Sequence, residues 1–139
     1  MAAKAKTLNR YLPEPKAERH NLFVEINADV AEAMNKVRER TTKPSGAPLS
    51  WNHLVESLLQ AALKEGPQGI FESQVEKFRP SLRSNRCQVQ ARIDLSTFEA
   101  FQEQRERLSA KLGFDFGWMY VVEILFRREL SKLGVALKS

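Results

Sequence analysis

The sequence predicts a mostly helical domain that contains a two-stranded antiparallel ribbon and is built from two copies of one strand–helix–helix unit. Three observations support this fold class. The chain repeats itself after 67 residues, two segments alternate with the period of a β-strand, and two helical segments are apolar over more than half of their circumference. One unit is too short to bury such helices, and a lone strand lacks a backbone partner. Two units solve both problems together.

The repeat aligns residues 19–63 with residues 86–130 without a gap. Thirteen of the 45 aligned positions are identical, whereas roughly three identities are expected by chance at ordinary residue frequencies. Both tryptophans of the chain, Trp51 and Trp118, fall in register. We therefore interpret the chain as a duplicated unit that forms one pseudo-symmetric domain.

Each copy begins with a strand that is expected to bury one face. Apolar side chains in residues 21–27 alternate with three outward positions, Asn21, Phe23 and Glu25. In residues 88–94 the outward positions are Gln88, Gln90 and Arg92. A period of two is typical of a strand with one buried side. Cys87 falls on the inward side of this alternation, so we expect a buried thiol.

Two helices follow each strand. Asp29 and Ser96 occupy the same repeat position, and a glutamate three residues after each one predicts a capping box. Glycines at repeat positions 46 and 113 end these first helices. The second helices start near Ser50 and Gly117, and their broad apolar surface predicts burial on several sides.

Two glutamates, Glu56 and Glu123, interrupt the apolar surface of the second helices at equivalent positions. A catalytic carboxylate normally has chemical partners nearby, and the sequence offers none. Arg127 lies one helical turn after Glu123. We therefore expect a structural ion pair or a hydrogen bond at a helix end.

These elements divide the chain into five segments. We expect a disordered basic arm at 1–18, a first module at 19–65, a linker that can form a short helix at 66–85, a second module at 86–134 and a C-terminal tail at 135–139. In the linker, Gly66 and Pro67 end the preceding helix. The arm is either a solubilising tail or a segment that contacts a polyanion.

Composition limits the partners and the compartment. The net charge of +5 and the pI of about 9.6 favour a polyanionic partner, which is usually nucleic acid or an anionic membrane surface. A single cysteine rules out an internal disulfide and indicates a reducing, cytoplasmic location. The first 15 residues lack the apolar segment of a signal peptide, and the most apolar run, from Trp118 to Phe126, is too short to span a bilayer.

The motifs of common enzyme classes are missing from the sequence. His20 and His53 do not have metal-ligand spacing, and there is no glycine-rich phosphate loop and no Ser/His/Asp set. We therefore expect no enzyme activity, no metal, no cofactor and no small-molecule ligand.

The order of alternating strand, capped helix, glycine turn and apolar helix resembles the ribbon-helix-helix family of the Arc and methionine-repressor type. The resemblance covers residues 19–65 and 86–133. That family normally forms an intertwined homodimer, whereas this chain resembles two protomers fused into one. The resemblance implies sequence-specific binding to double-stranded DNA, with the ribbon in the major groove.

In that family the outward strand residues contact base edges. By resemblance these residues here are Gln88, Gln90 and Arg92 of the second copy and Asn21, Phe23 and Glu25 of the first. Glutamine pairs with adenine and arginine with guanine. Glu25 repels a polyanion unless it accepts from cytosine, and Phe23 either touches a thymine methyl or packs on protein. We expect an asymmetric interface dominated by the second copy and suited to a non-palindromic site.

The family also anchors the DNA backbone at the N-terminus of each second helix, where free N–H groups and the helix dipole favour phosphate. The matching residues are Ser50, Trp51, Asn52, Gly117, Trp118 and Met119, and the basic arm adds Lys4, Lys6 and Arg10. Ser50 also suits an ordinary N-cap. For the two tryptophans, packing against the core is the favoured alternative.

The function implied by the resemblance is transcriptional regulation, often on bacterial mobile elements. One alternative is a DNA-binding accessory factor for plasmid conjugation or partition. A further alternative is a protein-interaction or antitoxin-like module. Family members usually bind in pairs, so the resemblance also allows two chains to associate on one DNA site.

Overall fold

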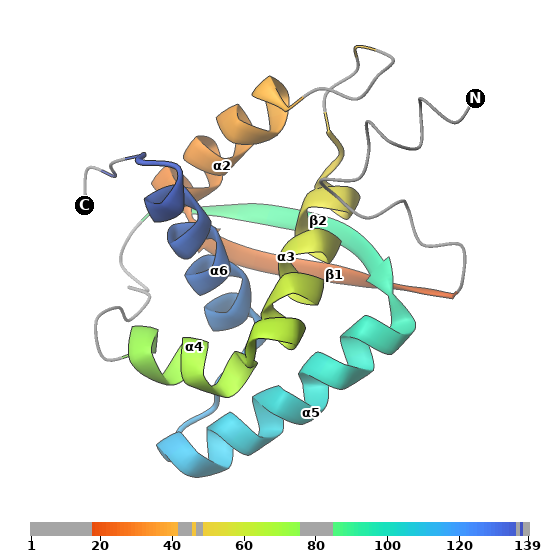
Figure 1. Cartoon of the computed structure of the whole chain (residues 1–139), viewed down its shortest axis with the longest axis vertical. Coiled ribbons are helices and arrows are strands. Elements are labelled where there is room, and N and C mark those ends of the chain that lie inside the picture. Colours follow the sequence, from red (N-terminus) through yellow and green to blue (C-terminus); the bar gives the residue numbers. More distant parts are fainter. Residues whose placement is uncertain (1–17, 42–45, 47–48, 76–84, 136, 138–139) are drawn as a thin grey trace.

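The computed structural model describes residues 18–41, 46, 49–75, 85–135 and 137. These residues form one two-stranded antiparallel sheet and five helices, as Figure 1 shows. The elements in chain order are β1 (Arg19–Asn27), α2 (Ala28–Arg40), α3 (Trp51–Glu65), α4 (Pro67–Val75), β2 (Arg86–Asp94), α5 (Leu95–Leu112) and α6 (Trp118–Lys132). The predicted fold, mostly helical with one antiparallel ribbon, is confirmed at this level.

The two strands pair along their whole length. The register runs from Arg19 opposite Asp94 to Asn27 opposite Arg86. Six apolar side chains on one face of the ribbon are buried: Leu22, Val24, Ile26, Val89, Ala91 and Ile93. The alternating pattern of the sequence therefore predicted the buried face of both strands correctly.

The helices that follow the ribbon begin two residues earlier than the capping boxes predicted. The N-cap of α2 is Asn27, whose Oδ1 accepts hydrogen bonds from the backbone N–H groups of Asp29 and Val30 at 2.9 and 3.2 Å. The N-cap of α5 is Asp94. The capping boxes at Asp29 and Ser96 are therefore wrong. Each strand continues into its helix without a loop, so the last strand residue takes the N-cap position.

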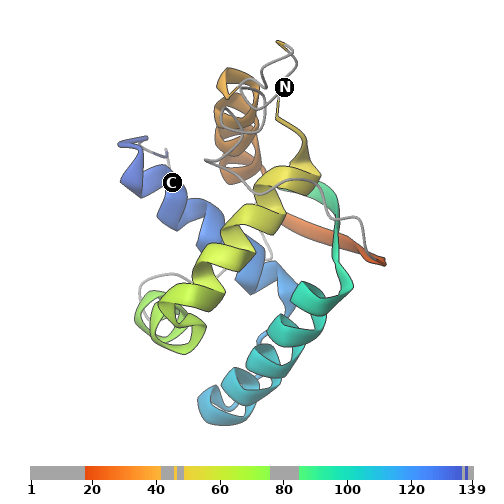
Figure 2. The same ribbon diagram turned by 45° about the vertical axis from the view of Figure 1, so that its right-hand side comes forward.

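The core lies under the buried face of the ribbon, where α3 and α6 cross (Figure 1, Figure 2). Every residue of α6 from Val121 to Phe126 is buried, which confirms the expected burial of that helix on several sides. Met34 of α2 and Phe101 of α5 are completely buried at equivalent positions of the repeat. Both copies therefore contribute matched side chains to a single core.

Helix α4 lies within the predicted linker and closes one end of the core. Its Phe71 is fully buried, with ring centroids 6.3 Å from Phe101 and 5.3 Å from Phe116. Gly66 ends α3 with φ of 113°, and Pro67 is the first residue of α4. Within the described part of the chain, no helix follows α6 as α4 follows α3.

Elements and contacts recur with the 67-residue shift of the sequence. The bounds of β1 and β2, and those of α3 and α6, differ by this shift at both ends. Arg38 donates through Nη1 to the Leu49 carbonyl at 2.8 Å, and the equivalent Arg105 donates to the Phe116 carbonyl at 3.3 Å. Each arginine therefore holds the start of a second helix against a first helix.

Candidate nucleic-acid interface

The outer face of the ribbon brings together all six side chains that the sequence predicted to contact bases. They are exposed and form three cross-strand pairs: Asn21 with Arg92, Phe23 with Gln90, and Glu25 with Gln88. Directly opposed residues of an antiparallel pair lie about 4.5–5.5 Å apart at Cα. The six side chains therefore form one contiguous surface with amide, guanidinium, carboxylate and aromatic groups.

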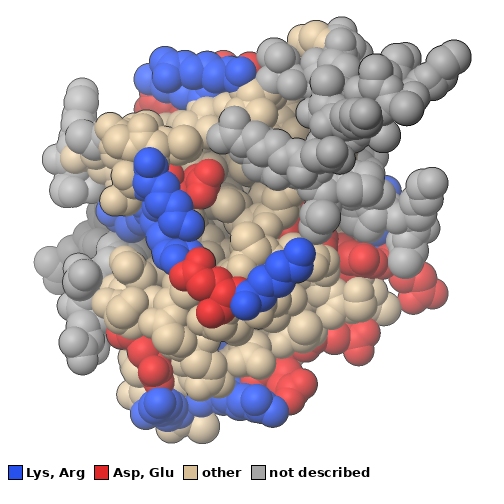
Figure 3. All heavy atoms as spheres, viewed as in Figure 1, with Lys and Arg blue, Asp and Glu red and all other residues tan. Residues whose placement is uncertain are grey.

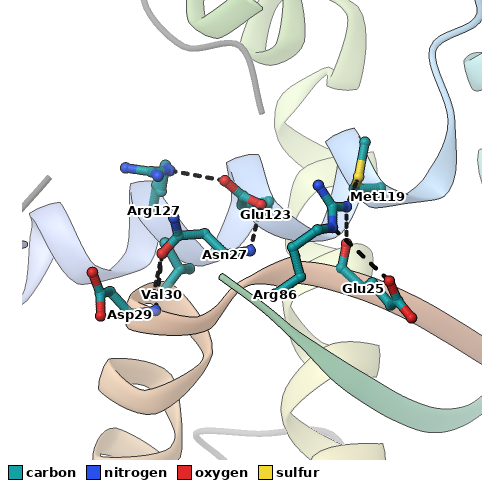
Figure 4. A network of polar contacts seen from close by, with 8 residues as sticks. All are labelled: Glu25, Asn27, Asp29, Val30, Arg86, Met119, Glu123 and Arg127. Atoms are coloured by element: carbon teal, nitrogen blue, oxygen red, sulfur yellow. Dashed lines mark hydrogen bonds and ion pairs between the residues drawn. The ribbon is translucent and has the colours of Figure 1, made fainter. Parts of the chain in front are cut away.

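Charge is distributed unequally along this surface. At one end, Arg92 is exposed opposite the amide of Asn21, and no ion pair with another described residue engages its guanidinium group. At the other end, Glu25 Oε2 lies 4.0 Å from Arg86 Nε. Figure 4 shows Arg86 also reaching the Glu25 carbonyl and Met119 Sδ. The surface therefore carries a positive end and an end where opposite charges offset each other.

The N-terminus of α3 is tied directly to the ribbon. Ser50 is the N-cap, and its Oγ accepts from the His53 backbone N–H at 3.2 Å, as the ordinary capping interpretation expected. Asn52 Oδ1 accepts from the backbone N–H of Arg92 at 2.7 Å. This bond occupies the Asn52 carbonyl oxygen and leaves its amide nitrogen for other partners. It also fixes the helix start beside the strand that carries Arg92.

The N-terminus of α6 is built differently. Gly117 is the N-cap and provides no side chain to satisfy the first N–H groups of the helix. Met119 lies beside Arg86, which brings a guanidinium group close to this end (Figure 4). The two predicted phosphate-binding positions therefore have different surroundings, with a serine cap at α3 and open backbone donors at α6.

The two tryptophans are partly buried and pack against the core. Trp118 stacks on Phe98 with ring centroids 5.1 Å apart, and its Nε1 donates to Gln102 Oε1 at 3.0 Å. Trp51 packs against Phe126 at 5.8 Å, and the Arg38 guanidinium carbon lies 5.3 Å from its ring centre. The favoured interpretation of both tryptophans as packing residues agrees with these contacts. The Trp118 N–H is already used within the protein.

The buried glutamates join the two copies. Glu123 is 1% exposed; its Oε1 accepts from the Asn27 backbone N–H at 2.9 Å, and its Oε2 accepts from Arg127 Nε at 3.3 Å (Figure 4). The equivalent Glu56 accepts from the Asp94 backbone N–H at 2.9 Å. Each carboxylate thus comes from one copy and binds the end of the other copy's strand. The expected structural role is confirmed.

The partners of Glu56 differ from those of Glu123. Glu56 Oε2 accepts from Thr97 Oγ1 at 2.6 Å and from Gln60 Nε2 at 2.8 Å. Gln60 stands at the repeat position of Arg127. One carboxylate is therefore held by neutral donors and the other by a cation. The sequence indicated the Arg127 pair and left a hydrogen bond at a helix end as an alternative, but it did not identify Asn27 and Asp94 as the donors.

The prediction of a buried Cys87 is wrong, because the thiol is exposed. At the equivalent place in the other copy, His20 stacks on Phe98 with ring centroids 3.7 Å apart. The counterpart of Phe98 is Ala31, which is too small to cover Cys87. The result is a hollow of about 340 Å³ that Cys87, Ala31 and Trp51 help to line.

On the face that Figure 3 shows, acidic side chains gather toward the right-hand edge, and elsewhere basic and acidic side chains lie close to one another. Several form pairs, such as Arg107 with Glu103, Lys111 with Glu72 and Arg128 with Glu65. Lys4, Lys6 and Arg10 of the predicted basic arm, and most of the C-terminal tail, lie outside the described residues.

The described residues include neither a candidate metal cluster nor a candidate membrane span. No group of three or more His, Cys, Asp and Glu side chains is arranged there to hold a metal ion. None of the described helices combines the length and the apolar character that a bilayer crossing requires.

Comparison of the chain with protein-family models, curated proteins and solved structures finds no match. The assignment of a function therefore depends on the residues and the geometry of the chain itself. The outer face of the ribbon, with the two helix N-termini beside it, is the strongest candidate site.

Proposed function

We propose that this chain is a sequence-specific double-stranded DNA-binding protein of the ribbon-helix-helix type, and that it acts in transcriptional regulation. One observation carries the proposal: six predicted base-contacting side chains form a single exposed face on a two-stranded antiparallel ribbon. The major groove of B-DNA admits a two-stranded ribbon and displays a different set of donors and acceptors for each base pair. The face offers matching amide and guanidinium groups.

The proposal includes two modules fused into one pseudo-symmetric domain. The crossed carboxylates support this arrangement, because Glu56 binds the strand of the second copy and Glu123 binds the strand of the first. The ribbon register supports it as well. Phe23 lies opposite Gln90, and the same two residues are equivalent in the repeat. A pseudo-two-fold axis then passes through this central pair.

The chemistry of the face favours a directional DNA site. Gln88 and Gln90 suit adenine, and Arg92 suits guanine, each bidentate contact being worth about 1–3 kcal/mol of discrimination. Glu25 at the opposite end suits the amino group of cytosine, with Arg86 close enough to reduce its repulsion from phosphate. The two strands thus present different chemistry around the central pair, and a palindromic site does not match both.

Phosphate anchoring is proposed at the starts of α3 and α6. Asn52 holds the start of α3 against β2, so a phosphate bound there fixes the ribbon in register. At α6 the N-cap Gly117 leaves the first backbone N–H groups without a side-chain partner. Free N–H groups at a helix N-terminus favour an anion.

The test is the selection of bound duplexes from a random DNA pool at moderate salt, with Arg92→Ala run in parallel. We expect a defined motif for the natural chain and a loss of preference at one base pair for the variant, since Arg92 is exposed and its removal leaves the core intact. The affinity for the preferred base falls by about 1–3 kcal/mol. An identical motif from both proteins would exclude Arg92 as a base contact.

An accessory role in plasmid conjugation or partition uses the same interface and is the second candidate. Footprinting on the native DNA distinguishes a promoter from an origin. The exposed Phe23 favours a protein-interaction or antitoxin-like role as a third candidate. DNA binding weakens steeply with salt, whereas an apolar protein contact through Phe23 does not.

A further inference from the structure

The centre of the ribbon face carries an apolar ring that the fold does not need. Among the described residues two large apolar side chains are exposed, Phe23 at 53% and Leu133 at 42%. Leu133 lies at the end of α6, whereas Phe23 lies in the middle of β1, directly opposite Gln90. Its neighbours on the same face of β1 are Asn21 and Glu25. Within the proposed DNA interface this ring has no polar group that could pair with a base edge, so the contact it suits is an apolar group on a base.

The major groove offers one such feature. Among the base edges exposed there, the C5-methyl group of thymine is the apolar group, and phenylalanine is one of the side chains that contact it. 5-Methylcytosine carries a methyl at the same ring carbon. The two bases differ in their hydrogen-bonding groups but present the same apolar surface to an aromatic ring.

We propose that Phe23 contacts the C5-methyl group of a pyrimidine, so that DNA binding by this chain depends on that methyl whether thymine or 5-methylcytosine carries it. This inference rests on the proposed DNA binding and names a chemical class that the ribbon recognises.

The cross-strand partner of Phe23 supports thymine at the unmodified site. An A·T pair displays the thymine methyl beside the N6 and N7 groups of adenine. Gln90, directly across the ribbon, is the side chain that pairs with those adenine groups. Phe23 and Gln90 together therefore fit the two halves of one A·T pair, or two neighbouring pairs, at the centre of the site.

The methyl contact has a measurable size. Removing one methyl group from water contributes about 0.8 kcal/mol, which corresponds to about a four-fold change in Kd. The same ratio is expected for thymine over uracil and for 5-methylcytosine over cytosine, because each pair differs by the methyl alone.

The experiment uses the full chain and its selected duplex. Single replacements of thymine by uracil first locate the position at which loss of the methyl weakens binding. Four duplexes that carry thymine, uracil, cytosine or 5-methylcytosine at that position are then titrated with the natural chain, with Phe23→Gln and with the control Leu133→Gln. Phe23→Gln places a polar residue at this exposed position and gives the centre of β1 the residue found at the centre of β2, Gln90. Thermal denaturation verifies that it is folded.

The expected result is a methyl preference of about four-fold in both pairs for the natural chain and for Leu133→Gln. For Phe23→Gln the preference falls to about one in both pairs. Equal binding of methylated and unmethylated duplexes by the natural chain overturns the inference, and so does a preference that persists in Phe23→Gln. Failure of the proposed function would give a different experimental result. The random pool would then yield no motif, or Arg92→Ala would leave the motif unchanged.

Discussion

The two copies of the unit are alike where they carry the fold and unlike where they face outward. Glu56 and Glu123 each accept a backbone N–H at the end of the other copy's strand, and Gly46 and Gly113 both have positive φ. The predicted helix end at Gly113 is confirmed, whereas the one at Gly46 is wrong, because α2 ends at Arg40 with Thr41 as its C-cap. None of the three outward strand positions is identical between the copies: Asn21 against Gln88, Phe23 against Gln90, and Glu25 against Arg92. The buried contacts are thus repeated, while the exposed ribbon presents two different chemical surfaces.

The same comparison shows a difference in packing at one pair of equivalent places. Aromatic rings fill one place, and a hollow is left at the other. His20 of the first copy stacks on Phe98 of the second, and Phe98 in turn stacks on Trp118. At the equivalent place, Cys87 of the second copy and Ala31 of the first stand at the positions of the first two rings, and a hollow remains beside Trp51. The two equivalent places therefore differ in packing, although the strands beside them have equivalent bounds.

The largest effect is expected from separating the copies. A fragment that ends at Gly66 should fail to fold as a monomer, because β1 then lacks its pairing strand and Asn27 lacks the Glu123 carboxylate. Circular dichroism and analytical ultracentrifugation measure this directly. A folded monomeric fragment would show that one copy is self-sufficient and that the crossed contacts are dispensable.

A smaller effect distinguishes the two buried glutamates. Glu123→Ala leaves the Asn27 N–H unsatisfied and separates Arg127 from its buried partner, so we expect a loss of about 3 kcal/mol in unfolding free energy. Glu56→Ala leaves only neutral donors without their acceptor, so we expect the unfolding free energy to fall by about 2 kcal/mol.

Urea denaturation of both variants, beside the natural chain, gives the difference. A greater loss for Glu56→Ala than for Glu123→Ala would mean that the cation at Arg127 adds nothing to the crossed contact.

The smallest effect on the unfolding free energy is expected from adding a ring at the open site or removing the ring at the filled site. Ala31→Phe places a ring over the hollow beside Cys87 and should raise the unfolding free energy by about 1 kcal/mol. Its matched counterpart, Phe98→Ala, removes a ring that stacks between His20 and Trp118 and should lower it by about 2 kcal/mol. If Ala31→Phe destabilises the protein instead, the backbone units differ enough that the first copy has no room for the ring.

The sequence predicted the ribbon well because a strand with one buried side leaves a period of two that few other structures share. That pattern placed Phe23 and Gln90 outward, and the repeat made them equivalent. It did not predict their register, which depends on pairing between distant segments. The helix starts were displaced by two residues because the strand ends directly at Asn27 and Asp94, where a local motif search favoured Asp29 and Ser96.

Cys87 shows the limit of the same pattern. Alternation gives the side of the ribbon on which a residue lies, whereas burial also requires an element that covers it. The covering residue is Ala31, which lies 56 positions earlier in the chain, and its small size is what leaves the thiol exposed. The Arg127 pair of Glu123 was predicted because it is local, and the bond from Asn27 was missed because 96 residues separate the partners.

The pairing of β1 with β2 inside one chain changes how folding responds to dilution. Two separate copies would assemble only above a threshold set by their association constant, and their stability would fall as the protein became scarce. A covalent connection makes the pairing of the two strands intramolecular. Its effective concentration, about millimolar, depends on the linker and not on the total protein concentration. A cell that holds only a few molecules of this protein therefore retains them folded.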